Sequence, residues 1–318
     1  MKTAIAAPPK QKSLPSPLAR LGKNIRRDRY LIFMVLPVVV YYIIFHYIPM
    51  YGVVIAFKDF SIRDGILGSN WVGLKWFREF FSSVYFGRVL KNTLLLSIFN
   101  LLWSFPVPIV FALFLNELKN GWYKKTVQTI SYFPYFMSTV IVVGMLVNFV
   151  SPRFGIVNQL IRMLGGTSVD FMVEPKYFRS LYIITDVWKS FGWNSVIYLA
   201  ALSGIDPQLY EAARIDGAGK WKQLLHVTIP CVVPTMIIML ILNVGNIMSL
   251  GFEKILLMYN PATYETADVI STYVYRRGII GSQYSFGAAV GLFNSVINLV
   301  LLFSVNTISR RMSDVSLW

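Results

Sequence analysis

Residues 206–234 read DPQLYEAARIDGAGKWKQLLHVTIPCVVP and lie between two long apolar runs. The first seventeen residues of this stretch carry three acids and three bases, and the stretch as a whole contains three prolines and a Gly-Ala-Gly turn. Asp206 is a favoured helix N-cap, and Pro207 suits the first helical position. Gly217 follows where a left-handed C-terminal cap is needed. The pattern therefore predicts two short helices joined by a tight turn.

The predicted helix pair presents small side chains, which favours docking over catalysis. Glu211, Ala212 and Ala213 lie on the first helix, where the alanines let another surface approach closely. The letters GAGKW resemble a phosphate-binding loop, but that loop needs a glycine five residues before its second glycine and Ser or Thr after the lysine. Arg214 and Trp221 stand at those positions. The stretch therefore predicts no nucleotide site.

The composition of the whole chain indicates a membrane protein. Of its 318 residues, 55% are hydrophobic and only 14% are charged, whereas soluble domains carry about 25% charged residues. The net charge of +15 does not indicate nucleic-acid binding, because a groove-binding domain needs a solvated basic face. An excess of Lys and Arg is typical of the cytoplasmic loops of membrane proteins. Cys231 is the only cysteine and the two histidines have no zinc-ligand spacing, so we expect no metal.

Apolar runs of about 20 residues predict six transmembrane helices, and hence an all-α polytopic membrane protein. The first 29 residues hold eight bases and one acid, which predicts a basic cytoplasmic tail at 1–29 before a transmembrane domain at 30–318. An even number of spans then places both termini in the cytoplasm. The predicted spans cover roughly 30–57, 90–115, 127–150, 181–204, 232–258 and 286–308.

The fourth predicted span carries two charges, Asp186 and Lys189, three residues apart. Charge inside a membrane is costly and by default suggests function. The same spacing also allows a structural pair that neutralises itself, and the sequence leaves both interpretations open. Aromatic and amide side chains of the third to sixth spans are further candidates for a polar path, although each also suits packing or hydrogen bonding between helices. These are Tyr135, Trp188, Trp193, Asn194, Asn243, Asn246 and Asn294.

Residues 211–230 closely resemble the EAA loop of importer permeases of the ATP-binding-cassette class. The family pattern is E-A-A, three residues, G, nine residues and I-x-L-P. Here Glu211-Ala212-Ala213 is followed by Gly217 at that spacing, and Val227-Thr228-Ile229-Pro230 keeps the proline with two aliphatic changes. The letters IDGA, which include Asp216 and Ala218, are typical of sugar importers. PMYGVVIAFKDF, GSNWVGLKWF and NTLLLSIFNLL resemble the branch that imports polysaccharide fragments, and the likeness runs from about residue 30 to the end.

The resemblance implies a non-catalytic permease subunit in the bacterial cytoplasmic membrane. Its expected partners are a second homologous permease, two ATPase subunits, an extracytoplasmic solute-binding protein and membrane lipid, and not nucleic acid. ATP and magnesium would belong to the ATPase, with no cofactor in this chain. The loop at 205–231 would be the coupling helix that docks on the ATPase. The residues that carry this role by resemblance are Glu211, Ala212, Ala213, Asp216, Gly217, Ala218 and Pro230.

The expected substrate is an oligosaccharide or polysaccharide fragment, acidic ones included. The loop at roughly 259–285 mixes aromatic rings and bases, which are enriched at interaction surfaces. We expect it to contact the binding protein through Tyr264, Tyr273, Arg276 and Arg277. The alternatives are an importer of the same class for a simple sugar or glycerol phosphate, and an ion-coupled secondary transporter. The docking loop and the absence of several buried acids disfavour the latter, and no HExxH, GxSxG or paired intramembrane aspartates indicate a hydrolase.

Overall fold

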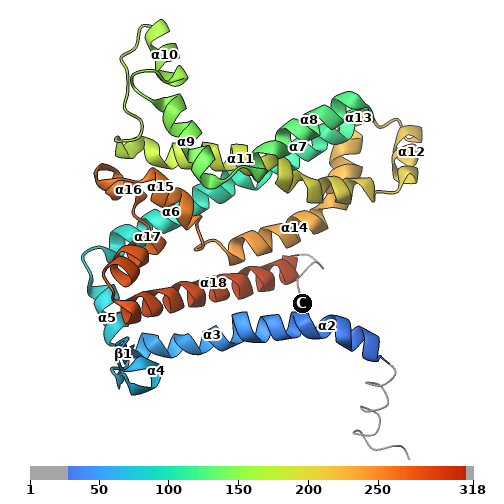
Figure 1. Cartoon of the computed structure of the whole chain (residues 1–318). Helices are drawn as coiled ribbons and strands as arrows, with labels where there is room; N and C mark the ends of the chain where they lie inside the picture. Colours follow the sequence, from blue (N-terminus) through green and yellow to red (C-terminus); the bar gives the residue numbers. More distant parts are fainter. Residues whose placement is uncertain (1–27, 313–318) are drawn as a thin grey trace, which may run out of the picture. The chain divides into compact units, whose positions relative to one another are not determined.

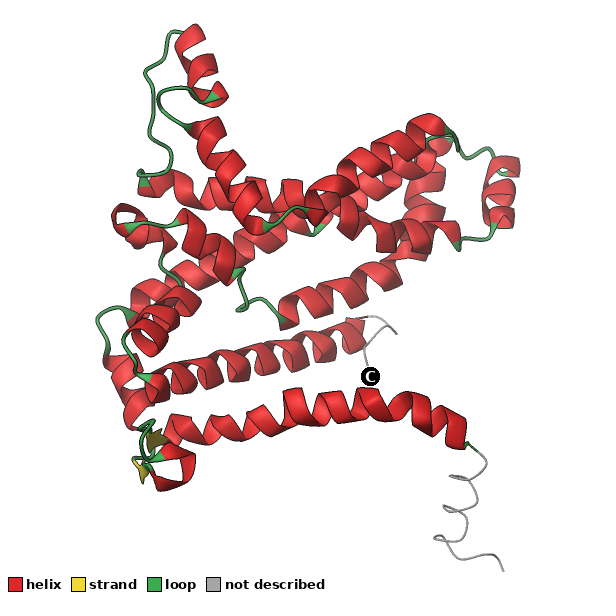
Figure 2. Ribbon diagram, in the orientation of Figure 1, coloured by secondary structure: helices red, strands yellow, loops and turns green. Residues whose placement is uncertain are grey.

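The computed structural model describes residues 28–312, and Figure 2 shows that this part of the chain is almost entirely helical. The chain divides into two compact units, Met1–Val54 and Ile55–Trp318. All but the last two residues of the predicted basic tail at 1–29 lie outside the described residues. Both units are helical, which agrees with the predicted fold class.

The described part of the first unit is one long apolar helix. It runs through α2 (Arg29–Tyr42), the π-helical turn η1 (Ile43–Tyr47) and α3 (Ile48–Met50) into the 3-10 segment η2 (Tyr51–Phe57), whose last three residues belong to the second unit. Together, Arg29–Phe57 form a candidate membrane span of 29 residues. The wider π turn lies just before Pro49, whose ring removes a backbone donor. A helix that is apolar on all sides suits lipid or another helix as its surroundings.

The second unit opens with a small hairpin. The strands β1 (Lys58–Asp59) and β2 (Asn70–Trp71) are antiparallel, with Lys58 opposite Trp71, and they flank α4 (Gly65–Gly68). The Lys58 ammonium donates to the carbonyls of Ile66 at 2.7 Å and Leu67 at 3.1 Å, which closes the loop. The amphipathic helix α5 (Lys75–Ser82) follows and buries Phe80. Within residues 28–312, this hairpin is the only strand structure.

The third predicted span is not one straight helix. It forms α8 (Trp122–Tyr132), η3 (Phe133–Phe136) and α9 (Thr139–Val150), and the chain bends by 101° between the last two. Pro134 lies in η3, and Ser138 restarts the helix as an N-cap whose side chain accepts from the amide of Ile141. The predicted span at 127–150 is therefore broken into two helices, because a proline turn followed by a new cap ends one helix and begins another.

The fifth predicted span is displaced. Its helix runs through α13 (Lys220–Gln223), the π-helical turn η4 (Leu224–Thr228) and α14 (Ile229–Gly245), and α15 (Phe252–Met258) is a separate short helix. The span is therefore Lys220–Gly245 rather than 232–258. The π turn carries the helix past Pro230, so the second predicted short helix is continuous with the membrane span. The first is α12 (Pro207–Ile215).

Four helices of residues 28–312 are long and apolar enough to span a membrane, or five with the bent α8–α9 pair. Two others match predicted spans well, since α6 (Phe86–Ser104) continues into α7 (Pro106–Glu117) and α18 covers Tyr284–Met312. The fourth predicted span is helical as α11 (Pro175–Ser203), but its composition is too polar to qualify. The structure therefore confirms that the predicted spans are helical, but it does not confirm that there are six of them.

Figure 1 shows α12 at one end of the second unit and α15–α17 at the opposite end. In that group, α16 covers Tyr264–Ala267 and α17 covers Ile270–Val274. The same end also holds α10 (Ile156–Met163), η5 (Pro261–Thr263) and the π-helical turn η6 (Tyr275–Ile280). A core cluster around Phe80, Tyr273 and Phe286 fixes this end, and a second around Leu96, Tyr182 and Ile255 joins it to α11. The long α11 connects the two ends.

Candidate functional site

The geometry of α12 follows its sequence closely. The Asp206 carboxylate accepts from the amide of Gln208 at 2.9 Å, and Pro207 occupies the first turn. Gly217 has φ +76°, and the amide of Ala218 donates to the Ala213 carbonyl at 2.8 Å. This is the left-handed C-terminal cap that the sequence predicts. The cap turns the chain sharply and leaves α12 projecting from the unit.

The surface of α12 is open and more apolar than the sequence suggested. Among the predicted coupling residues, Glu211, Ala212, Asp216, Gly217 and Pro230 are exposed, whereas Ala213 and Ala218 are half-buried. Beside them, the side chains of Ile215 and Trp221 are 87% and 75% exposed. Sequence reasoning missed these two, although large apolar residues in a mixed-charge loop are a signal for an interface. The arrangement suits docking on another protein.

Two contacts hold α12 and α13 to the rest of the unit. The hydroxyls of Tyr210 and Thr228 are 3.0 Å apart, and the Lys220 ammonium lies 3.0 Å from the Glu117 carboxylate at the end of α7. The first contact joins α12 to the π turn η4, which continues into α14. This contact therefore ties α12 to the helix that spans the apolar region.

The partner of Asp186 is Lys254 of α15. The Lys254 ammonium lies 3.1 Å from one Asp186 oxygen and donates to the carbonyl of Tyr182 at 2.7 Å. Its side chain is 6% exposed, against 30% for Asp186. Asn100 of α6 donates to the other Asp186 oxygen at 3.1 Å. The self-neutralising pair with Lys189, one of the two interpretations that the sequence left open, therefore does not form, because the more deeply buried ammonium of another helix binds the carboxylate.

Asp186 also faces a polar cavity of about 260 Å³ between α6, α11 and α14. Asn243 and Asn246, both predicted path residues, share this cavity. Asn100 and Lys254 were missed by sequence reasoning, although Lys254 stands with Glu253 in the otherwise apolar run GFEKILLM, where charge is the same signal that singled out Asp186. The polar residues that line the cavity are Ser97, Asn100, Ser104, Tyr182, Asp186, Asn243, Asn246 and Ser249.

Lys189 lies near the break between α8 and α9. Its ammonium donates to the Thr139 hydroxyl at 3.2 Å, and within residues 28–312 no carboxylate is at ion-pair distance from it. Close in sequence to Thr139 and Lys189, the rings of Tyr135 and Trp193 stack, with their centroids 5.1 Å apart and an angle of 12° between the ring planes. Phe136 contacts Trp193 edge-on. The bend in the third span thus places a lysine with a neutral partner and an aromatic stack on adjoining turns of α11.

The remaining predicted path residues lie elsewhere. Trp188 borders an apolar cavity of about 520 Å³ together with Trp103 and Phe191. Asn194 is exposed, and Asn294 donates to the Met248 carbonyl at 3.3 Å, which joins α18 to the chain beyond α14. The structure therefore brings Asp186, Asn243 and Asn246 together at the polar cavity and stacks Tyr135 on Trp193, whereas Trp188, Asn194 and Asn294 lie apart from both groups.

The segment 259–285 is folded rather than an open loop. Tyr273 is 2% exposed and its hydroxyl lies 3.1 Å from that of Ser83. Its predicted outward-facing role is therefore corrected, since the ring packs in the core with Phe80 and Phe286. Tyr264 stays half-buried beneath the Arg276 guanidinium.

The two predicted arginines of this segment form ion pairs. Arg276 binds both oxygens of Asp268, at 3.1 and 2.8 Å, and Arg277 reaches Glu79 at 2.6 Å. Hydrogen bonds with the Asp268 carboxylate raise the pKa of the Arg276 guanidinium above its ordinary value. Both arginines are partly exposed.

Residues 80–314 match the family model described as "Binding-protein-dependent transport system inner membrane component". The polygalacturonan/rhamnogalacturonan transport system permease protein YteP of Bacillus subtilis (strain 168) is 42% identical over 299 residues, covering 94% of this chain and 93% of the relative. This chain and YteP are thus similar over nearly their whole lengths.

Two solved structures also resemble the chain. One is a bacterial ABC transporter involved in the import of the acidic polysaccharide alginate, with 45% identity, a TM-score of 0.86, and coverage of 92% of this chain and 99% of the solved chain. The other is a bacterial alginate ABC transporter in complex with an alginate pentasaccharide-bound periplasmic protein, with 44% identity, a TM-score of 0.86, and coverage of 94% and 100%.

Proposed function

Since the chain belongs to the binding-protein-dependent transport system inner membrane components, we propose that it forms one half of the membrane path of an ATP-driven importer for acidic oligosaccharides. The observation that carries the proposal is the polar cavity between α6, α11 and α14, which is lined by Asp186 and by the amides of Asn100, Asn243 and Asn246. Amides and hydroxyls can exchange hydrogen bonds with sugar hydroxyls, whereas lipid cannot.

The acidic character of the substrate rests on two supports. The named relatives handle polygalacturonan, rhamnogalacturonan or alginate, and the last is called an acidic polysaccharide. In this chain, the Lys189 ammonium has a neutral partner, Thr139, within a helix where an unpaired charge is expensive. A passing carboxylate compensates that charge without a permanent bond.

The proposed coupling runs through α12. The exposed apolar side chains of Ile215 on α12 and Trp221 on α13 would fit a groove on an ATPase subunit, and Glu211 lies one helical turn before Ile215. The contact between Tyr210 and Thr228 passes the movement of α12 to α14. The proposed assembly contains a second homologous permease, two ATPase subunits that hold ATP and magnesium, and an extracytoplasmic solute-binding protein. The α12 end and both termini then face the cytoplasm.

ATP hydrolysis by the reconstituted complex tests this proposal. The purified chain alone is expected to hydrolyse no ATP, because its GAGKW stretch lacks the phosphate-loop spacing. With the partner permease and the ATPase subunits in lipid, hydrolysis should rise when binding protein loaded with oligogalacturonate is added. Methyl-esterified oligogalacturonate of equal length is the matched neutral control. Hydrolysis by the chain alone, or stimulation by the neutral oligomer only, contradicts the proposal.

A further inference from the structure

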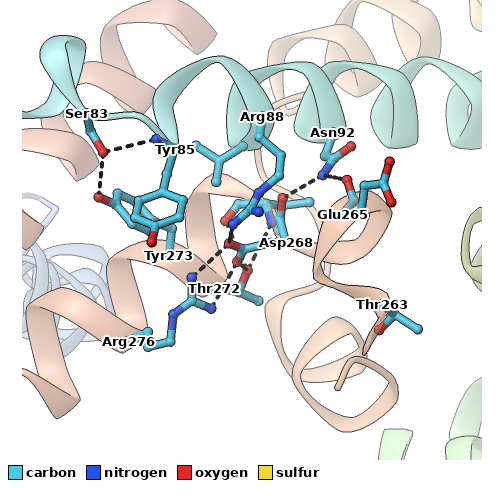
Figure 3. A network of polar contacts seen from close by, with 12 residues as sticks. Ser83, Tyr85, Arg88, Asn92, Thr263, Glu265, Asp268, Thr272, Tyr273 and Arg276 are labelled. Carbon is cyan, nitrogen blue, oxygen red and sulfur yellow. Dashed lines mark hydrogen bonds and ion pairs between the residues drawn. The ribbon is translucent and has the colours of Figure 1, made fainter. Parts of the chain in front are cut away.

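Three arginines from different parts of the second unit converge at the end that holds α15–α17. They are Arg88 of α6, Arg179 of α11 and Arg276 of η6, and we call them the arginine cluster. Figure 3 shows the network around Arg88, Arg276, Asn92 and Asp268. These elements are far apart in sequence, so the grouping is a product of the fold.

The cluster holds more positive charge than its partners neutralise. Asp268 is fully buried, and both of its carboxylate oxygens accept hydrogen bonds from Arg276. One of them also accepts a longer bond, 3.4 Å, from Arg88. Arg179 donates to the Asn92 side-chain oxygen at 2.9 Å, and that acceptor is neutral. Within residues 28–312, Asp268 is the one carboxylate in an ion pair with any of these three guanidiniums.

The bonding of two of these arginines is incomplete. The Nε atoms of Arg88 and Arg179 are buried and have no hydrogen-bond partner within residues 28–312. A guanidinium offers five donors, and a cluster built only to hold helices together is expected to satisfy its buried donors. These two donors without a partner are instead consistent with a site that binds an external hydrogen-bond acceptor. Each such missing bond disfavours the unoccupied state and is recovered when an anion rearranges the side chains.

The cluster can be reached from outside the unit. The Arg88 and Arg276 side chains are 34% and 28% exposed, and Arg179 is half-buried. Aromatic rings lie against two of them, with the Arg88 guanidinium 5.0 Å from the Tyr85 ring and that of Arg276 4.8 Å from the Tyr264 ring. Guanidinium donors bind carboxylates bidentately, and aromatic rings offer flat apolar faces to sugars.

We propose that the arginine cluster is a carboxylate-binding site that receives uronate units of the substrate before they pass toward the polar cavity. The inference rests on the proposed function, which places this end opposite α12 and therefore outside the cytoplasm. Asp268 and Asn92 hold the guanidiniums in position, and the single charge of Asp268 leaves two of the three guanidinium charges uncompensated, that of Arg179 among them. The site selects anionic saccharides by charge and leaves chain length to other contacts.

Direct binding of trigalacturonate to the purified transporter complex, without binding protein, tests the site. The wild-type complex is expected to bind trigalacturonate and to bind its methyl ester at least about tenfold more weakly, because a charge-assisted bond is lost. Arg179→Gln should weaken trigalacturonate binding about tenfold and leave binding of the ester unchanged, while Arg179→Lys recovers part of the loss. Lys176→Gln, which removes an exposed charge three residues earlier on α11, is the matched control.

The thermal unfolding temperature of each variant complex separates a recognition role from a structural one. Equal binding of trigalacturonate by wild type and Arg179→Gln overturns the inference. An equal loss for acid and ester, accompanied by a lower unfolding temperature, also overturns it in favour of a purely structural cluster. Uptake distinguishes the two proposals, since binding that depends on Arg179 without any uptake of acidic oligomers defeats the proposed function and leaves the site standing. If wild type and Arg179→Gln take up acidic oligomers with the same half-saturation concentration, the proposed function stands and the proposed binding site is defeated.

Discussion

The helix α12 and the middle of α11 both carry charge next to apolar chain, yet they use it differently. The charges of α12 are solvated, and its shape comes from contacts within a few residues, namely Asp206 with Gln208 and the cap at Gly217. The charge of Asp186 is neutralised by Lys254, 68 residues away, in a largely buried pair. We infer that α12 is free to bind a partner, whereas the Asp186 pair is part of the framework that holds the polar cavity.

The largest expected effect comes from Lys254→Met. This change leaves the Asp186 carboxylate with Asn100 alone and should destabilise the unit by about 3 kcal/mol. The Asp186→Asn and Lys254→Met double variant should recover most of that loss, because no charge is then uncompensated. Thermal unfolding in detergent measures both. Lys189→Met is the matched control, and a comparable loss for that variant removes the distinction between the two lysines.

Gly217→Val should come next, with its effect on coupling rather than on insertion. A β-branched residue at φ +76° costs ~1–2 kcal/mol, enough to reduce transport-linked ATP hydrolysis roughly tenfold by misplacing α12. Gly219→Val is the matched control, because Gly219 has φ −69° and open space around its Cβ position. If both valine variants couple normally at normal expression, α12 does not depend on its cap.

Glu211→Lys should have a smaller effect of the same kind. The side chain is exposed, so its reversal changes docking and not folding, and we expect roughly a fivefold fall in transport-linked hydrolysis. Raising the concentration of ATPase subunits should restore part of the activity. Titration of the membrane subunits with the ATPase measures this, and unchanged affinity between them contradicts a docking role for α12.

The smallest effect is expected for Lys189→Met. Its ammonium donates to Thr139 only, so assembly and the unfolding temperature should stay close to wild type. Uptake of oligogalacturonate should fall roughly threefold, while uptake of the methyl ester is unchanged. Competition between the two labelled oligomers in one vesicle preparation gives the ratio directly. An equal fall for both removes Lys189 from substrate recognition.

Features that depend on contacts between residues close in sequence could be predicted, whereas features that depend on long-range contacts could not. The caps of α12, the membrane class and the resemblance to importer permeases could all be predicted, because local chemistry and motif spacing determine them, and the family match confirms the resemblance. The partner of Asp186 could not, since helical spacing allowed Lys189 and only the fold brings Lys254 to it. The burial of Tyr273 was missed for the same reason.

ATP-driven uptake of labelled trigalacturonate tests the central claim most directly. Proteoliposomes containing this chain, the partner permease and the ATPase subunits would receive loaded binding protein outside and ATP inside, with the α12 end of the chain facing the lumen. The account predicts accumulation of trigalacturonate that needs ATP, is weaker for the methyl ester, and is lost with Gly217→Val but kept with Gly219→Val. Accumulation without ATP, or equal accumulation in both valine variants, contradicts an importer of acidic oligosaccharides coupled through α12.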